Sequence, residues 1–145
     1  MSVNSRCETH WEHFSHVADI GIRGYGKTLE QAFEQTAVAM IAVICDPAII
    51  KPEMPLPIQC DAPDHELLLT EWLNALIYEM AVRKVLFGRF EVRIDGTYLQ
   101  ATAWAENLDR ARHRPVVEVK GATYTELRVT RQDNGIWLAQ CIIDV

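Results

Sequence analysis

Residues 26–47, GKTLEQAFEQTAVAMIAVICDP, carry the clearest structural pattern in the sequence. Apolar residues recur along them at helical spacing. Thr28 followed by Gln31 is the pattern of a capping box, in which each side chain accepts a free backbone N–H at the start of a helix. Asp46-Pro47 ends the pattern, because proline disfavours a helical conformation in the residue before it. The stretch therefore predicts a helix that buries an apolar face made of Leu29, Phe33, Ala37, Met40 and Ile44.

A second helical pattern occupies residues 63–84, PDHELLLTEWLNALIYEMAVRK. Asp64 is a suitable N-cap after Pro63, and Glu66 lies in the first turn, where the helix dipole favours negative charge. The broad apolar stripe of this helix is typical of packing against a core. Five of the six prolines fall between the two patterns, in residues 47–63. We expect this stretch to separate two helices of one domain, because neither side has enough elements to close a core alone.

The other segments alternate apolar and polar residues, as β-strands do. The predicted strands are 16–25, 90–95, 98–106, 115–121, 125–131 and 136–144. Asp95-Gly96 and Asn134-Gly135 are hairpin signals. The strand at 98–106 has a small apolar face suited to contact with a helix, made of Leu99, Ala101, Ala103 and Ala105. The fold class expected is α+β, with a mainly antiparallel sheet and the two helices packed on one of its faces.

The composition is that of an ordinary globular domain and excludes several classes of protein. The chain has 145 residues, of which 49% are hydrophobic, and 14 Lys and Arg against 20 Asp and Glu give a net charge of −6. Tight direct binding to nucleic acid is disfavoured by this acidity. No secretory signal or membrane span is seen, so we expect a cytoplasmic protein without a membrane partner. The four cysteines are too far apart for zinc or redox motifs and are predicted to be free thiols.

The candidate chemistry lies in HVADIGIRGYGKT, residues 16–28, and at the C-terminus, since common nucleotide, protease and esterase signatures are absent. His16 and Asp19 suit a divalent ion, but on local evidence alone a turn capped by Asp19 and a buried His16 is the better explanation. Asp144 and the α-carboxylate of Val145 lie one residue apart. If the last strand pairs beside Asp19, three carboxylates converge and need a bound cation or raised pKa values. The alternative is a frayed, solvated terminus.

Two groups of basic residues have open interpretations. Lys120 follows a β-rich segment, and it is either a surface lysine or a cation held near the acidic residues or offered to a partner. The basic cluster Arg110, Arg112, His113 and Arg114 is either a solvated loop or an RNA-binding patch.

The chain resembles the archease family from about His13 to Val145. The segments that carry the resemblance are HVADIGIRGYGKTLEQAF, LLLTEWLNALIYE, LFGRFEV, RHRPVVEVKGATYTELRV and WLAQCIIDV, in this order. The resemblance implies a single archease domain at 13–145 with the archease-like α+β fold, preceded by a poorly matched N-terminal extension at 1–12.

The resemblance also implies a function. Members of the family are accessory activators, not enzymes, that bind a divalent metal ion, calcium, and promote guanylylation and multiple turnover of an RtcB-type RNA ligase. This implies a role in tRNA splicing and RNA repair, with RNA met only indirectly through the ligase. Carried over by position, the metal ligands fall on Asp19, Asp144 and Val145, and partner activation falls on Lys120 and Asp19. His16 is expected beside the site, as a neighbour of the metal ligands.

Two other classes of function remain open from the sequence. A metal-dependent hydrolase would use the same carboxylates and would need a general base, for which His16 and His113 are the candidates. A chaperone-like, RNA-binding adaptor would use an exposed apolar surface or the basic cluster around Arg112.

Overall fold

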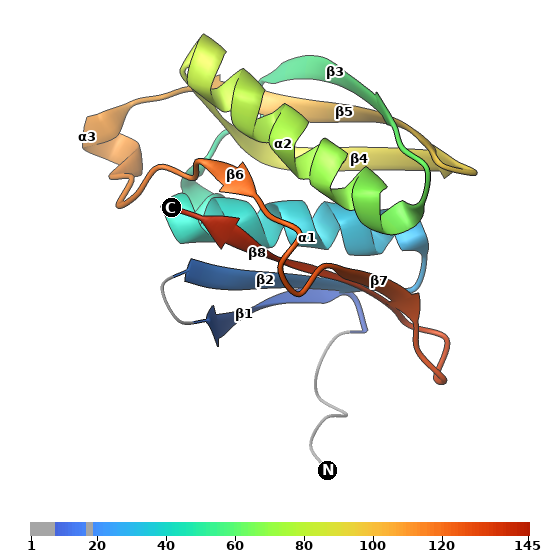
Figure 1. Cartoon of the computed structure of the whole chain (residues 1–145). Helices are drawn as coiled ribbons and strands as arrows, with labels where there is room; N and C mark the ends of the chain where they lie inside the picture. Colours follow the sequence, from blue (N-terminus) through green and yellow to red (C-terminus); the bar gives the residue numbers. More distant parts are fainter. Residues whose placement is uncertain (1–7, 17–18) are drawn as a thin grey trace.

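The computed structural model describes residues 8–16 and 19–145 (Figure 1). The elements in chain order are β1 (His10–His16), β2 (Asp19–Gly26), α1 (Leu29–Ile44), η2 (Pro47–Ile49), β3 (Met54–Asp61), α2 (His65–Arg83), β4 (Val85–Asp95), β5 (Tyr98–Asn107), α3 (Arg110–His113), β6 (Gly121–Ala122), β7 (Arg128–Arg131) and β8 (Trp137–Asp144). Within the described residues, no helix is both long enough and apolar enough to cross a membrane.

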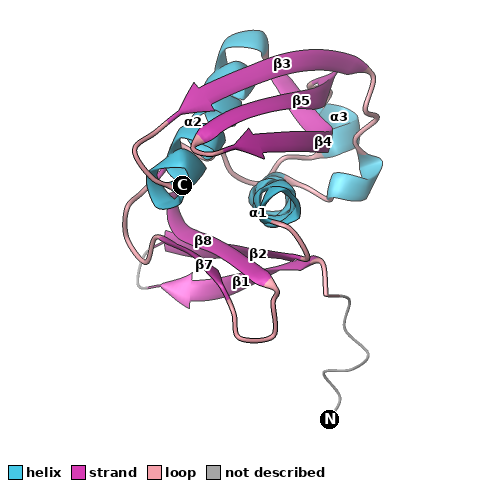
Figure 2. Ribbon diagram, turned by 90° about the vertical axis from the view of Figure 1, so that its right-hand side faces the viewer, coloured by secondary structure: helices cyan, strands magenta, loops and turns pink. Residues whose placement is uncertain are grey.

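Helix α1 lies between two antiparallel sheets (Figure 2). One sheet has the order β1-β2-β8-β6, with β7 also paired to β8, and the other has the order β3-β5-β4. Helix α2 contacts strands of both sheets. The α+β class and the mainly antiparallel pairing are therefore confirmed. The strands divide into two sheets because the buried residues of α1 extend around most of its circumference, so that this helix needs cover on two sides.

The start of each long helix is fixed by the predicted caps. Thr28 Oγ1 accepts the backbone N–H of Gln31 at 3.1 Å, as a capping box requires. The Gln31 side chain accepts from the N–H of Lys27 at 2.9 Å, one residue earlier than in the standard box. The carboxylate of Asp64 accepts from the N–H of Leu67 at 2.8 Å. Local sequence therefore determines where both helices begin.

Glycines of β2 let α1 approach the sheet closely. A Cβ atom on Gly24 would lie 2.4 Å from the backbone nitrogen of Thr36, and one on Gly26 would lie 2.5 Å from Cβ of Gln31. Real Cβ atoms do not approach so closely, so glycine is required at both positions. The even-numbered residues of β2 thus face α1, and the odd-numbered residues face away from it.

Strands β1 and β3 were not predicted from the sequence. In β3 the residues Pro55 and Pro57 hid an alternation in which Ile58 is buried. Proline is tolerated there because β3 is at the edge of its sheet, with β5 as its one strand partner among the described residues. The segment of β1, HWEHFSH, has no clear apolar alternation.

The predicted strand at 115–121 is wrong except at its last residue. Only Gly121 and Ala122 pair with β8, opposite Asp144 and Ile143. Because β8 ends at Asp144, the register leaves the valine-rich residues 116–119 beyond the end of their neighbour.

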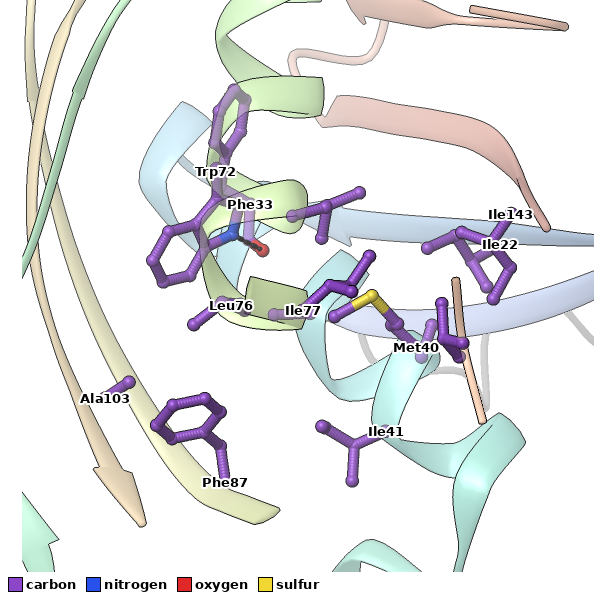
Figure 3. Packing of buried hydrophobic residues seen from close by; sticks show 14 of the residues in the cluster. Ile22, Phe33, Met40, Ile41, Trp72, Leu76, Ile77, Phe87, Ala103 and Ile143 are labelled. Atoms are coloured by element: carbon purple, nitrogen blue, oxygen red, sulfur yellow. Dashed lines mark hydrogen bonds between the residues drawn. The ribbon is translucent and has the colours of Figure 1, made fainter. Parts of the chain in front are cut away.

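The core fills the space between the sheets and contains the predicted apolar faces of both helices (Figure 3). The indole N–H of Trp72 in α2 donates to the carbonyl of Phe33 in α1 at 3.1 Å, which joins the two helices. Ala103 of β5 is fully buried, as expected from the small apolar face predicted for this strand.

The cysteines that the structure describes, Cys45, Cys60 and Cys141, are free thiols, as predicted. Burial raises the pKa of Cys141 to about 12. Cys7 lies outside the described residues.

Candidate functional site

The first residue of β2 and the last residue of β8 lie side by side. The two strands are antiparallel, and their register pairs Ile20 with Ile143. One step further along this register brings Asp19, which begins β2, opposite Asp144, which ends β8. Directly opposite residues of antiparallel strands have their Cβ atoms about 4.5–5.5 Å apart and on one face of the sheet. Both carboxylates therefore lie on the face that points away from α1.

Strand β6 brings Lys120 to the same place from the other side of β8. The backbone N–H of Lys120 donates to the carbonyl of Asp144 at 2.8 Å, and Gly121 pairs with Asp144. The C-terminus and β6 lie together in Figure 1. The side chains of Asp144 and Lys120 are exposed, and that of Asp19 is half-buried. The structure thus brings together three of the residues singled out in the sequence, although 125 positions separate Asp19 from Asp144.

The other two predicted site residues lie next to these three. The backbone of His16 pairs with Asp19 across the β1–β2 hairpin, while the His16 side chain falls outside what the structure describes. Val145 is half-buried and packs against the main core, next to the fully buried Ile143. The chain end is therefore held in place, and the alternative of a frayed terminus is wrong.

The donor atoms at the end of β8 suit a hard cation. Asp19 and Asp144 offer carboxylate oxygens, the ligand type that calcium and magnesium prefer. In the described part of the chain, no group of three or more His, Cys, Asp or Glu side chains is close enough to hold a metal ion. The side chains thus supply two carboxylates, and the remaining oxygens of a calcium site would come from the chain terminus, the backbone and water.

A second charged cluster, which the sequence did not reveal, surrounds Glu106 of β5. Glu106 is only 8% exposed. Its carboxylate accepts from the N–H of Lys51 at 2.8 Å, from His113 Nε2 at 2.8 Å and from the guanidinium of Arg112. Arg112 also donates to the carbonyl of Ile49 at 2.7 Å. Burial raises the pKa of Glu106, but these hydrogen bonds and the Arg112 charge together hold it below its ordinary value.

His113 is buried in this cluster, with contacts to both of its ring nitrogens. It is 1% exposed, and its Nδ1 accepts the backbone N–H of Asp109 at 2.9 Å. Its Nε2 lies 2.8 Å from a carboxylate oxygen of Glu106. A buried imidazole with both nitrogens engaged is not an accessible general base, so His113 does not support the hydrolase hypothesis.

The basic cluster is only partly available to a partner. Arg112 and His113 face Glu106, whereas Arg110 and Arg114 are exposed. A patch for RNA needs several cations on one accessible surface. The structure thus leaves two of the four predicted basic residues for this purpose.

The residues just before Lys120 in the sequence help to form a groove of about 340 Å³, which was not predicted. It is formed by the last turns of α2, the start of β4 and residues 115–119. The signal that could have found it is the valine-rich segment 116–119, three of whose four residues are apolar and which is followed by an exposed lysine.

Comparison with known proteins places the fold and the site in context. The model of the Archease protein family (MTH1598/TM1083) matches residues 11–145. Protein archease from Pyrococcus furiosus is 41% identical over 139 residues, which cover 93% of this chain and 98% of the relative. Protein archease from Methanosarcina barkeri is 36% identical and covers 93% of this chain and 95% of its own length.

Two solved structures have the same fold. The solution structure of Methanobacterium thermoautotrophicum protein 1598 has a TM-score of 0.81 and 31% identity, and the match covers 93% of this chain and 98% of that one. The crystal structure of an archease, possible chaperone, from Thermotoga maritima has a TM-score of 0.60 and 18% identity, with coverage of 91% and 94%. By its sequence over almost its whole length, this chain belongs to the archease family.

Proposed function

We propose that this protein is an accessory activator of an RtcB-type RNA ligase. It promotes guanylylation and multiple turnover of the ligase in tRNA splicing and RNA repair, acts in the cytoplasm and meets RNA only through the ligase. The proposal is supported by membership of the archease family. The observation that carries it is the register that aligns Asp19 with Asp144, with Lys120 bonded to Asp144.

In this proposal a divalent cation, calcium, is held by the carboxylates of Asp19 and Asp144 and by the α-carboxylate of Val145. When bound, the cation neutralises carboxylates that would otherwise repel one another. The protein's own part is positional. Pairing of β2 with β8 holds the two aspartates together, and Lys120 presents a positive charge beside them to the ligase. His16 is assigned as a neighbour of the site through its backbone pair with Asp19.

The proposal is tested with the RtcB-type ligase of the same organism, GTP and Mn²⁺. We expect the protein to increase the rate of ligase guanylylation and the number of turnovers per ligase, and calcium chelation to reduce this increase. An unchanged ligase rate would contradict the proposal. Turnover of substrate by the protein alone would favour the hydrolase hypothesis, and salt-sensitive retention of RNA would favour the adaptor.

A second candidate function, a chaperone-like activity, is favoured by one observation. Among the residues that the structure describes, four large apolar side chains are more than half exposed, namely Tyr78, Val82, Val116 and Tyr124. Exposed apolar side chains that gather into a patch are typical of protein interaction sites. Suppression of heat aggregation of an unrelated client protein, without any ligase present, would support this function over specific activation.

A further inference from the structure

Residues 116–119, Val-Val-Glu-Val, have the sequence of a β-strand but no strand partner among the residues that the structure describes. Val116 donates its N–H to the carbonyl of Ile44 at 2.9 Å, and Lys120 donates to Asp144. Between these two anchors, the N–H groups of Val117, Glu118 and Val119 form no hydrogen bond with any described residue. The carbonyls of residues 115–119 likewise accept none within the described chain. Unpaired backbone groups on a β-forming segment are a template for another strand.

The segment is held in place at both of its ends. Val119 is buried in the main core, and Pro115 restricts the backbone at the other end. Val116, in contrast, is 75% exposed. An edge that is already ordered costs little conformational entropy when a second strand binds to it. Residues 116–119 are therefore a ready-made edge.

The groove beside this edge is suited to an apolar side chain. Its opposite wall is made by α2 and β4, with Ile77, Met80, Ala81 and Val85 among its lining residues. A volume of about 340 Å³ holds one or two large side chains but is at the lower end for a small-molecule site. In strand addition, backbone hydrogen bonds give affinity while pockets select alternate side chains of the added strand. An edge and a pocket next to each other match that mode of binding.

The charged side chains around the groove indicate what kind of partner segment would bind there. Lys84 and Arg110 both line it and are exposed, against a single carboxylate from Glu118. Lys120 continues this positive side toward Asp144. The local charge is therefore positive on a chain whose net charge is −6. A segment with acidic residues next to an apolar one is the best complement.

We propose that residues 116–119 pair with an extended segment of the ligase, which places an apolar side chain in the groove and an acidic side chain near Lys84 and Arg110. The inference rests on the proposed function and names the surface through which the ligase binds. The segment would run directly to Lys120, so that one contact surface joins the groove to the end of β8.

The test uses Ala81→Trp, which fills the groove from an exposed position of α2, and Glu71→Trp as a control at an exposed position of the same helix outside the groove lining. Binding to the purified ligase is measured by calorimetry. We expect Ala81→Trp to weaken binding by about tenfold, while Glu71→Trp stays within about twofold of the unmodified protein. The charge reversal Arg110→Glu is expected to weaken binding less and to reduce its dependence on salt.

Amide hydrogen exchange tests the strand pairing directly. In the free protein, we expect the amides of residues 117–119 to exchange rapidly, because they donate to no acceptor within residues 8–16 and 19–145. In the complex they should exchange about tenfold more slowly or more. A complex that forms normally with Ala81→Trp and gives no protection at 117–119 would overturn this inference and leave the proposed function intact. If the unmodified protein neither binds nor activates the ligase, both fall. Protection in the free protein that grows with concentration would instead assign the edge to a second copy of this chain.

Discussion

The two charged clusters of this protein differ in how their charge is compensated. Around Glu106, a buried carboxylate meets the N–H of Lys51, the imidazole of His113 and the guanidinium of Arg112. At the end of β8, the register instead aligns two carboxylates, Asp19 and Asp144, and neither forms an ion pair within the described residues. The first arrangement is complete in itself and holds segments together. The second arrangement brings two negative charges together, and an external cation or a partner protein would stabilise it.

The largest effect is expected at the complete cluster. Glu106→Ala removes the acceptor shared by Arg112, His113 and Lys51 and leaves a buried imidazole N–H unsatisfied, so we expect a loss of about 3 kcal/mol in the free energy of unfolding. Urea denaturation measures it. Glu91→Ala, at an exposed residue whose nearest cation is 3.9 Å away, is the control and should cost less than about 0.5 kcal/mol. Equal costs would show that the Glu106 cluster is not structural.

Asp19→Ala should separate function from stability at the other cluster. We expect calcium affinity to fall by about tenfold or more, with ligase activation lost and the urea midpoint almost unchanged. Asp133→Ala is a matched control, because Asp133 is exposed in the β7–β8 loop. Calcium titration and the guanylylation assay give the two measurements. Full activation by Asp19→Ala would remove Asp19 from the site.

Lys120→Ala sharpens the comparison by removing a charge without removing a ligand. A protonated lysine cannot coordinate a metal, so calcium affinity should stay within about twofold while ligase activation falls. Lys51→Ala removes another exposed lysine side chain and is the control, since only the Lys51 backbone contacts Glu106. If calcium affinity fell and activation did not, Lys120 would have a different role.

A smaller effect is expected from the chain end. A short peptide tag fused after Val145 replaces its α-carboxylate by a neutral amide, which removes one proposed ligand and should weaken calcium binding by about threefold to tenfold. The same tag at the N-terminus should leave affinity unchanged. Equal calorimetric affinities for both tagged forms and the untagged protein would show that Val145 is not a ligand.

The smallest effect concerns pH and returns to Glu106. Its pKa in the folded protein is held below the ordinary value of 4.5, so its charged form stabilises the fold above that pH. This contribution should be lost as the pH falls below 4.5 and through the folded-state pKa. We expect the stability difference between the unmodified protein and Glu106→Gln to shrink over that range. A difference that is constant from neutral to acid pH would contradict the lowered pKa.

Local signals predicted much of the fold but only part of the candidate site. The caps at Thr28 and Asp64 act within a few residues, and so both helices could be located in advance. Strand β3 was missed because prolines are acceptable only on an edge, and edge position depends on the whole sheet. The hypothesis that His113 is an accessible general base was also wrong. The His113 side chain contacts Glu106, which lies in strand β5, and no local pattern around His113 indicates this contact.

The sequence by itself determined the helices, the α+β class and the identity of the residues that could bind a cation, because periodicity, capping and side-chain chemistry are local properties. Only the tertiary structure decided that the strands divide into two sheets around α1 and that Asp19 lies opposite Asp144. It alone also decided that residues 116–119 have no strand partner in the described part of the chain. Strand register and burial depend on contacts between residues far apart in the chain, which no local pattern encodes.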